Sequence, residues 1–294
     1  MEILGLKKRP TELVELQAIA SLGQSKLMEI YNTYFKKYNL NCGQILLTWE
    51  DFNQRRRYLN ARNTILKLLQ IKAIPIINEN DTVATEEIKF GDNDRLSSLV
   101  ASLVDADILV ILSDVDGLLD EKERLIRIVE DIKPYIHLCR DTDKQTCVGG
   151  MISKLESARI ALESGIFCVI ANGKKKDILL KILESPFDSG TLFLPRKEKL
   201  LAIKRWIAFG AKPKGKIFVD EGAKQALLNK KSLLAVGIVA VEGEFKKGDI
   251  VSVFDTKNNE FCRGKVEIDS KEIQNIKGKR FVHEVIHQNN LVIL

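Results

Sequence analysis

Residues 74–94 read IPIINENDTVATEEIKFGDND, and this stretch decides the fold prediction. It opens with an apolar run around Pro75, which is typical of a strand buried on both faces of a parallel sheet. Carboxylate and carboxamide side chains follow in two clusters, which end at Asp81 and Asp94. In open α/β sheets, ligands bind at the edge where such strands end. The second cluster precedes the helical run RLSSLVASLV, so its side chains can cap a helix whose N-terminus attracts anions.

Taken alone, clusters of Asn, Asp and Gly are the ordinary chemistry of loops and caps. Here three more segments follow in order: ADILVILSDVD (106–116), GGMISK (149–154) and GIFCVIANG (165–173). The first and third are apolar strands that end in polar residues or glycine, and the second is a glycine pair before a helix with a lysine. Strands and helices alternate from a helix at about 11–38, through a strand at 43–48 and a helix at about 51–69, onward. This alternation predicts a parallel sheet sandwiched by helices over residues 1–195.

The sequence pattern changes after the charged segment 195–199, which we interpret as a linker. Short strands punctuated by glycine, with a helix at 221–228, predict a small, mainly β barrel over about residues 205–294. Residues 196–294 contain 20 Lys and Arg against 12 Asp and Glu, a net charge of +8, whereas the whole chain carries +6. The basic excess therefore lies entirely in the last third.

Length and cysteine content limit the class of protein further. The 294 residues suit two domains with a sizeable core. The five cysteines show no C-x-x-C spacing, which is typical of reduced, structural thiols in a cytosolic protein. No apolar run reaches the length of a membrane span, and the N-terminal apolar stretch is too short for a signal peptide. We therefore expect a cytoplasmic protein without a membrane partner.

Several segments together resemble the glutamate 5-kinase family of amino-acid kinases. They are QAIASLGQ (17–24), QILLTWEDF (44–52), YLNARNT (58–64), INENDTVATEEIKFGDND (77–94), LSDVDGL (112–118), GGMISK (149–154), GTLF (190–193) and KRWIAFG (204–210). Each segment is a weak signal alone, but the ordered set covers nearly the whole chain and is specific. The resemblance implies an amino-acid kinase domain followed by a PUA-like domain, a fold often used on structured RNA.

The resemblance also implies the roles of individual residues. Asp81 and Asn93 would hold L-glutamate, and an acidic group for its ammonium with a carboxamide for its carboxylate makes chemical sense. Ser113 and Asp114 match a nucleotide-binding pair. The phosphate-binding segment is Gly149, Gly150, Met151, Ile152, Ser153 and Lys154. Lys154 would be the catalytic lysine that reaches the phosphates of ATP, with Mg²⁺ bridging those phosphates. The expected partners are L-glutamate, ATP, RNA at the PUA-like domain and further copies of the chain in a homo-oligomer.

Two parts of the family pattern do not occur in this sequence. One is a first strand with a lysine and a glycine-serine phosphate loop, and the other is a strand that ends in Ser-Gly-Ala. Val148 also replaces a hydroxyl residue. A shortened working kinase and a degenerate, glutamate-binding member both fit, and the intact core pattern favours the first. We expect little kinase activity from residues 1–294 alone and recovery when those N-terminal elements are present.

Other readings of the sequence lead to different functions. A kinase of the same superfamily could act on aspartate, carbamate or a nucleotide, and a regulatory protein could work through RNA binding by the barrel alone. The segment HEVIH (283–287) matches the HExxH zinc-protease motif. That motif requires a helix and a third ligand, whereas this segment is rich in β-branched residues and no His, Asp, Glu or Cys follows it. We therefore expect a strand there and no zinc chemistry.

Overall fold

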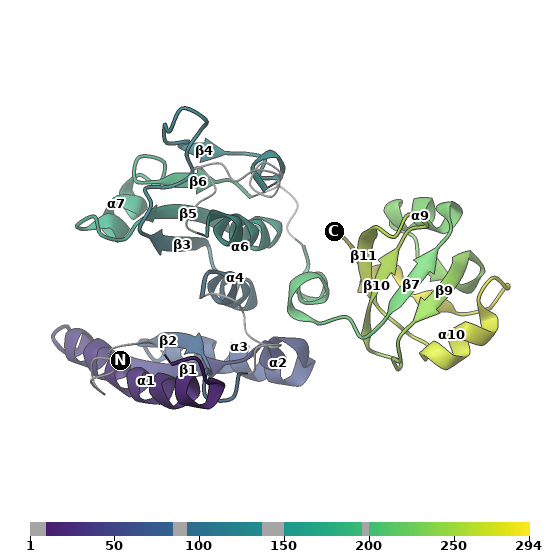
Figure 1. Cartoon of the computed structure of the whole chain (residues 1–294), viewed down its shortest axis with the longest axis horizontal. Coiled ribbons are helices and arrows are strands. Elements are labelled where there is room, and N and C mark those ends of the chain that lie inside the picture. The colour runs from purple at the N-terminus through teal and green to yellow at the C-terminus, as the bar shows by residue number, and fades with distance from the viewer. Residues whose placement is uncertain (1–9, 85–92, 137–149, 196–199) are drawn as a thin grey trace. The chain divides into compact units, whose positions relative to one another are not determined.

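The computed structural model describes residues 10–84, 93–136, 150–195 and 200–294 (Figure 1). The chain divides into two compact units, Met1–Lys199 and Leu200–Leu294. The elements of the first unit are α1 (Leu13–Lys36), β1 (Asn41–Leu47), α2 (Trp49–Asn53), α3 (Arg55–Gln70), β2 (Ala73–Glu79), α4 (Asn93–Val104), β3 (Ile108–Ser113), β4 (Ile128–Val129), α6 (Met151–Glu163), β5 (Phe167–Asn172), α7 (Ile178–Glu184) and β6 (Thr191–Phe193).

The described strands of the first unit form two sheets. β1 and β2 pair in parallel, with Leu47 opposite Glu79. The other sheet has the order β3-β5-β6-β4, in which β3–β5 and β4–β6 are parallel and β5–β6 is antiparallel. Helix α4 lies between the two sheets and contacts β2 and β3 (Figure 1). The predicted α/β class is confirmed, but the four-stranded sheet is mixed because β4 and β6 run opposite to β3 and β5.

Two details of the sequence prediction are wrong. The strand around Pro75 is not buried on both faces, since only Ala73 of β2 is fully buried. The reason is that β2 pairs with β1 alone among the described strands. The helix expected at about 51–69 is two helices, because Gln54 between α2 and α3 has an extended backbone with φ −90° and ψ 114°.

The core of the four-stranded sheet is centred on α6 and β5. Leu155, Ala158 and Ala161 of α6 are fully buried, as are Cys168 and Ile170 of β5. This burial explains the continuous apolar run of residues 165–171, because a strand covered on both faces needs apolar side chains in both directions. Burial also raises the pKa of the Cys168 thiol, which keeps it protonated and makes it a packing residue.

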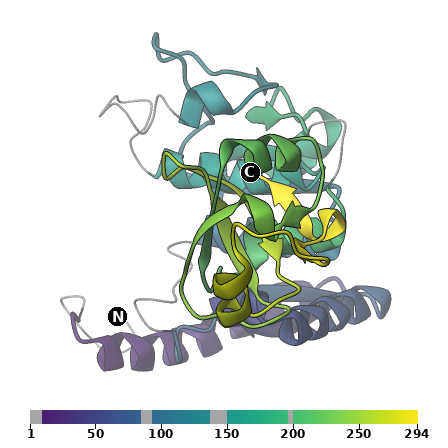
Figure 2. The ribbon, with the colours of Figure 1, turned by 90° about the vertical axis from the view of Figure 1, so that its right-hand side faces the viewer.

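The second unit is a small β structure. Its elements are α8 (Ala202–Arg205), the π-helix η4 (Trp206–Gly210), β7 (Lys216–Val219), α9 (Glu221–Leu228), β8 (Leu233–Leu234), η5 (Ala235–Gly237), β9 (Ile238–Glu242), β10 (Ile250–Phe254), β11 (Glu260–Lys265), α10 (Ser270–Ile276), β12 (Glu284–Ile286), η6 (Gln288–Asn290) and β13 (Leu291–Ile293). Five strands pair in the order β13-β11-β10-β7-β9, and β12 pairs with β8. Figure 2 turns this unit, coloured green to yellow, toward the viewer. Its buried core contains Ile217, Val253 and Val285, so the unit has a hydrophobic core of its own.

The HExxH match falls on strand β12 and its flanks. Glu284–Ile286 is extended and pairs with β8, so the two histidines do not share a helix face. The Nε2 atom of His287 instead lies 3.8 Å from a carboxylate oxygen of Glu284. Elsewhere, none of the helices in the described ranges combines the length and the apolar character that crossing a membrane requires.

Candidate active site

Short connections bring two strand ends and two helix ends to one edge of the four-stranded sheet. Residues 105–107 join α4 to β3, and residues 164–166 join α6 to β5. Such short links make each helix run antiparallel to the strand that follows, so its N-terminus lies beside the carboxyl end of that strand. β3 and β5 are parallel, with Ser113 opposite Asn172. Both helix N-termini therefore lie at the edge where both strands end.

Two polar contacts show that α4 and α6 run side by side in the same direction. Near the helix N-termini, the Nζ atom of Lys154 lies 2.8 Å from the Oδ2 atom of Asp94. Near the other end, the hydroxyl of Ser164 donates to that of Ser102 at 3.0 Å. Because the helices are parallel, the positive ends of both helix dipoles lie together, and this region favours an anion.

Lys154 is the best-fixed cation of this region. Its side chain is 12% exposed and that of Asp94 is 21% exposed, so water competes little with their ion pair. Gly150 caps the N-terminus of α6 in the left-handed conformation with φ 76°, which favours glycine. Among the described residues, a Cβ atom at Gly150 would meet only the Lys154 Nζ, at 4.0 Å. A lysine ammonium beside a glycine backbone at a helix N-terminus fits a phosphate group.

The remaining residues of the predicted phosphate segment differ in their surroundings. Met151 is 3% exposed and belongs to the core of the four-stranded sheet, so its side chain is a packing residue. Ile152 and Ser153 are half-buried in the first turn of α6. Gly149 lies outside the described residues. In this segment, therefore, the side chain with a charge to offer a ligand is that of Lys154.

The two predicted glutamate ligands lie on different elements. Asp81 follows the end of β2, and Asn93 is the first residue of helix α4. The backbone N–H of Asn80 donates to the carbonyl of Leu47 at 2.9 Å, so the chain after β2 stays against β1 up to Asn80, the residue before Asp81. Asp81 is half-buried, whereas Asn93 is exposed at the first position of α4. Within the described ranges, no hydrogen bond or ion pair engages the side chain of either residue. The described residues therefore leave both side chains available to bind a ligand.

The predicted nucleotide contacts, Ser113 and Asp114, lie at the end of β3. The hydroxyl of Ser113 donates to the Asp114 carboxylate at 3.1 Å, and Asp114 is exposed. The backbone N–H of Gly173 donates to the Ser113 carbonyl at 2.8 Å. A Cβ atom at Gly173 would lie 3.1 Å from the Leu112 Cβ, so glycine allows this close approach of the two chains. The loop after β3 is thereby held to the loop after β5.

Sequence reasoning did not assign a role to three polar residues of this edge. Asp94 belongs to the quoted acidic cluster, but its contact with Lys154 joins residues 60 positions apart. Asn172 donates to the Asp116 carboxylate at 2.9 Å. This hydrogen bond, together with the nearby Lys175 ammonium, holds the pKa of Asp116 below its ordinary value. The polar ending of the strand at residues 165–173 was the available signal for Asn172.

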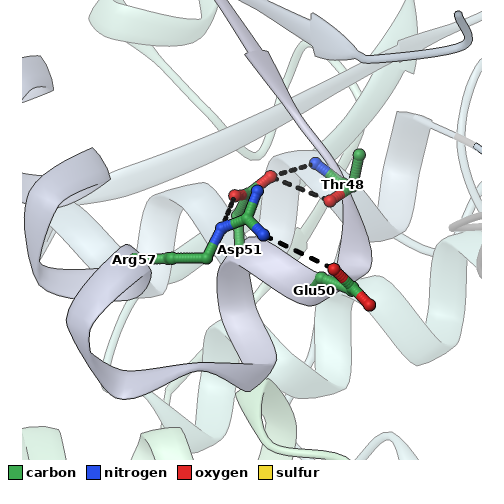
Figure 3. Close-up of polar contacts among 4 residues, drawn as sticks. All are labelled: Thr48, Glu50, Asp51 and Arg57. Carbon is green, nitrogen blue, oxygen red and sulfur yellow. Dashed lines mark hydrogen bonds and ion pairs between the residues drawn. The ribbon is translucent and has the colours of Figure 1, made fainter. Parts of the chain in front are cut away.

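A second polar network fixes the end of β1 (Figure 3). The Asp51 carboxylate accepts from the backbone N–H of Thr48 at 2.6 Å and from its hydroxyl at 2.9 Å. Arg57 of α3 donates to the other oxygen of Asp51 at 2.7 Å and to Glu50 at 3.4 Å. These contacts form a capping box that starts α2 immediately after β1. The segment that follows β1 is therefore rigidly placed.

Comparison with known proteins agrees with this architecture. Residues 1–172 match the amino acid kinase family, and residues 215–288 match the PUA domain. The glutamate 5-kinase of Thermoanaerobacter sp. (strain X514) is 43% identical over 99% of this chain and 83% of its own length. Those of Caldanaerobacter subterraneus subsp. tengcongensis and Aquifex aeolicus are 44% and 43% identical over 99% of this chain, and over 83% and 84% of their own lengths. The chain therefore belongs to the amino acid kinase family, as a member of the glutamate 5-kinases with a C-terminal PUA domain.

Proposed function

We propose that this protein transfers the γ-phosphoryl group of ATP to the side-chain carboxylate of L-glutamate. The products are ADP and L-glutamyl 5-phosphate, and the reaction is the first step of proline biosynthesis, in keeping with its family. One observation carries the proposal: Lys154 binds Asp94, which directly follows Asn93 in the first turn of α4. The residue for the phosphates and a residue for glutamate thus meet at one place. Residues 1–195 carry this site, and residues 205–294 form the PUA-like domain.

Asp81 and Asn93 hold the amino acid. The Asp81 carboxylate accepts the glutamate ammonium, and the Asn93 amide donates to its carboxylate. Asn93 also begins α4, so the positive end of the helix dipole adds to its attraction for an anion. A ligand with both an ammonium and a carboxylate satisfies the two side chains together. Holding the glutamate in one orientation lowers the entropic part of the barrier.

Lys154 and the backbone at Gly149 and Gly150 hold the phosphates, while Ser113 and Asp114 hold the rest of the nucleotide. ATP supplies the phosphoryl group, and Mg²⁺ bound with ATP would neutralise charge on the phosphates. Within the described ranges, no cluster of three or more His, Cys, Asp or Glu side chains could hold a metal ion. Asp94 keeps the Lys154 ammonium in place, so little reorganisation is needed when charge develops on the transferring group.

The direct test is substrate selectivity. ADP release from ATP is measured with L-glutamate, L-aspartate, carbamate or a nucleoside monophosphate as acceptor, and calorimetry measures binding of each acceptor without turnover. We expect binding of L-glutamate and, whatever the absolute rate, ADP release that depends on it. Binding of another acceptor in preference to glutamate would identify a different kinase of the superfamily.

The PUA-like domain supports a second activity, which is contact with RNA. A groove of about 280 Å³ lies between α9 and the segment 232–237, with Ala223, Ala226 and Leu234 in its lining. Basic side chains lie in the same unit, among them Lys204 and Lys230. Burial lowers the pKa of Lys204, and the neighbouring Lys230 ammonium lowers it further. Filter binding of residues 196–294 to structured RNA should fall steeply as salt rises. No retention at low salt would mean that the net charge of +8 serves solubility.

Two further expectations belong to the proposal. The cysteine pattern predicts a cytoplasmic protein, and the family resemblance predicts a homo-oligomer. Helix α1 has no buried residue within the described chain and exposes Val14, Tyr34 and Tyr38. Light scattering coupled to size exclusion gives the mass in solution directly, and a mass of 33.2 kDa would identify a monomer.

A further inference from the structure

The first turn of α4 is held from two sides. On one side, Asp94 binds Lys154 of α6. On the other side, the guanidinium carbon of Arg95 lies 4.7 Å from the centre of the Trp49 ring, at the start of α2. Both Arg95 and Trp49 are half-buried. At this distance the guanidinium is attracted to the face of the indole, and partial burial strengthens that attraction.

Trp49 is a suitable platform because its backbone is fixed. It is the first residue of α2, between Thr48 and Asp51, whose reciprocal hydrogen bonds form the capping box. Arg57 of α3 holds Asp51 from the opposite side (Figure 3). Thr48 itself is 6% exposed and directly follows β1. The backbone that carries the indole is therefore tied to β1, α2 and α3.

The Trp49–Arg95 contact links the two residues that are proposed to bind glutamate, Asp81 and Asn93. β1 and β2 are parallel with Leu47 opposite Glu79, so Trp49 and Asp81 each lie two residues beyond paired positions at the same edge. Arg95 lies in the same helical turn as Asn93. Residues 85–92, which join Asp81 to Asn93 along the chain, lie outside the described residues. The contact between Trp49 and Arg95 connects the edge that carries Asp81 to the helical turn that carries Asn93 independently of residues 85–92.

We propose that Trp49 and Arg95 are positioning residues that set the distance between Asp81 and Asn93 and thereby the affinity for glutamate. This inference rests on the proposed function. The Trp49–Arg95 contact does not involve Ser113, Asp114 or Lys154. Its loss should therefore weaken binding of glutamate and leave binding of ATP nearly unchanged.

The test compares the full chain with Trp49→Leu, Arg95→Leu and the double variant. Calorimetry gives the Kd for L-glutamate and for ATP, and ADP release gives kcat and KM. Each single truncation should raise the glutamate Kd about five- to tenfold. The loss in the double variant should be smaller than the product of the two single losses, since both substitutions remove the contact that the two residues share. Trp49→Phe and Arg95→Lys should stay within about twofold of wild type, because each keeps a cation over an aromatic face.

Lys216→Leu is the matched control. It removes a cation–π contact in which the Lys216 ammonium lies 5.4 Å from the Phe254 ring, in the second unit. Glutamate affinity should not change in this variant. Unchanged glutamate affinity in both Trp49→Leu and Arg95→Leu would overturn the inference, as would multiplicative losses in the double variant or equal losses for glutamate and ATP. If the wild-type chain itself bound no glutamate, the proposed function would fall, and the inference with it.

Discussion

Replacing Lys154 by methionine tests the phosphate side of the site. The ammonium lies 2.8 Å from Asp94, its side chain is 12% exposed, and a Cβ atom at Gly150 would lie 4.0 Å from it. A hydrogen bond to a charged group contributes about 1.5–3 kcal/mol, so ATP affinity should fall about ten- to a hundredfold. A preorganised donor to the transition state is worth about a hundred- to a thousandfold in rate, so kcat should fall by that factor. Glutamate affinity should fall less than ATP affinity, because the contact between Arg95 and Trp49 still holds the first turn of α4.

The same substitution should also reduce stability, because it leaves the Asp94 carboxylate half-buried without its partner. An unsatisfied buried group of this kind costs about 1–3 kcal/mol in the free energy of unfolding. Urea unfolding measures that change, and calorimetry measures the Kd for ATP and for glutamate. Lys26→Met is the control, since Lys26 pairs with Glu29 at 2.7 Å on α1 with both side chains more than half exposed. Such a pair contributes about 0–1 kcal/mol. Wild-type affinity for ATP in Lys154→Met would refute the assignment of this lysine.

Two other predictions concern glutamate binding and acid stability. Asp81→Ala and Asn93→Ala should each weaken glutamate binding about ten- to a hundredfold with ATP binding retained, because each removes a partner of a charged group; calorimetric titration measures both, and equal affinities would contradict the assignment. In the second unit, the Lys224 ammonium, 2.8 Å away, and the backbone N–H of Asn259 hold the pKa of Asp255 well below its ordinary value. A depressed carboxyl pKa stabilises the folded state above the unfolded pKa of about 3.9, and this contribution is lost as pH falls through the folded pKa. Asp255→Asn should therefore lower the thermal midpoint at pH 7 and flatten its decline below about pH 4, and an unchanged decline would count against this ion pair.

The sequence predicts those features of the fold that depend on local patterns. Helix α9 at Glu221–Leu228 and the start of α6 at Met151 follow from capping residues and apolar spacing. The burial of β2 could not be predicted in this way, because burial depends on which strands pair with it. The break at Gln54 is an extended backbone at a single residue, which the apolar spacing of residues 51–69 does not reveal.

The candidate site likewise combines residues that local sequence patterns predict with long-range contacts that those patterns do not predict. The roles of Asp81, Asn93, Ser113 and Lys154 are predicted from the family resemblance that the ordered motifs carry. The Lys154–Asp94 contact could not be predicted in this way, since it joins residues 60 positions apart and depends on the parallel packing of α4 and α6. The contact between Arg95 and Trp49 also joins separate elements, so the sequence around neither residue reveals it. Long-range contacts of this kind require the structure.

The most direct test of the proposed activity is the identity of the acceptor that receives the phosphoryl group. L-glutamate labelled with ¹³C at its side-chain carboxyl is incubated with the protein, Mg²⁺ and ATP, and hydroxylamine traps the acyl phosphate as it forms. The proposed reaction predicts a hydroxamate that contains the label, in an amount equal to the glutamate-dependent ADP. ADP release without labelled hydroxamate, or hydroxamate formed from aspartate in place of glutamate, would contradict it.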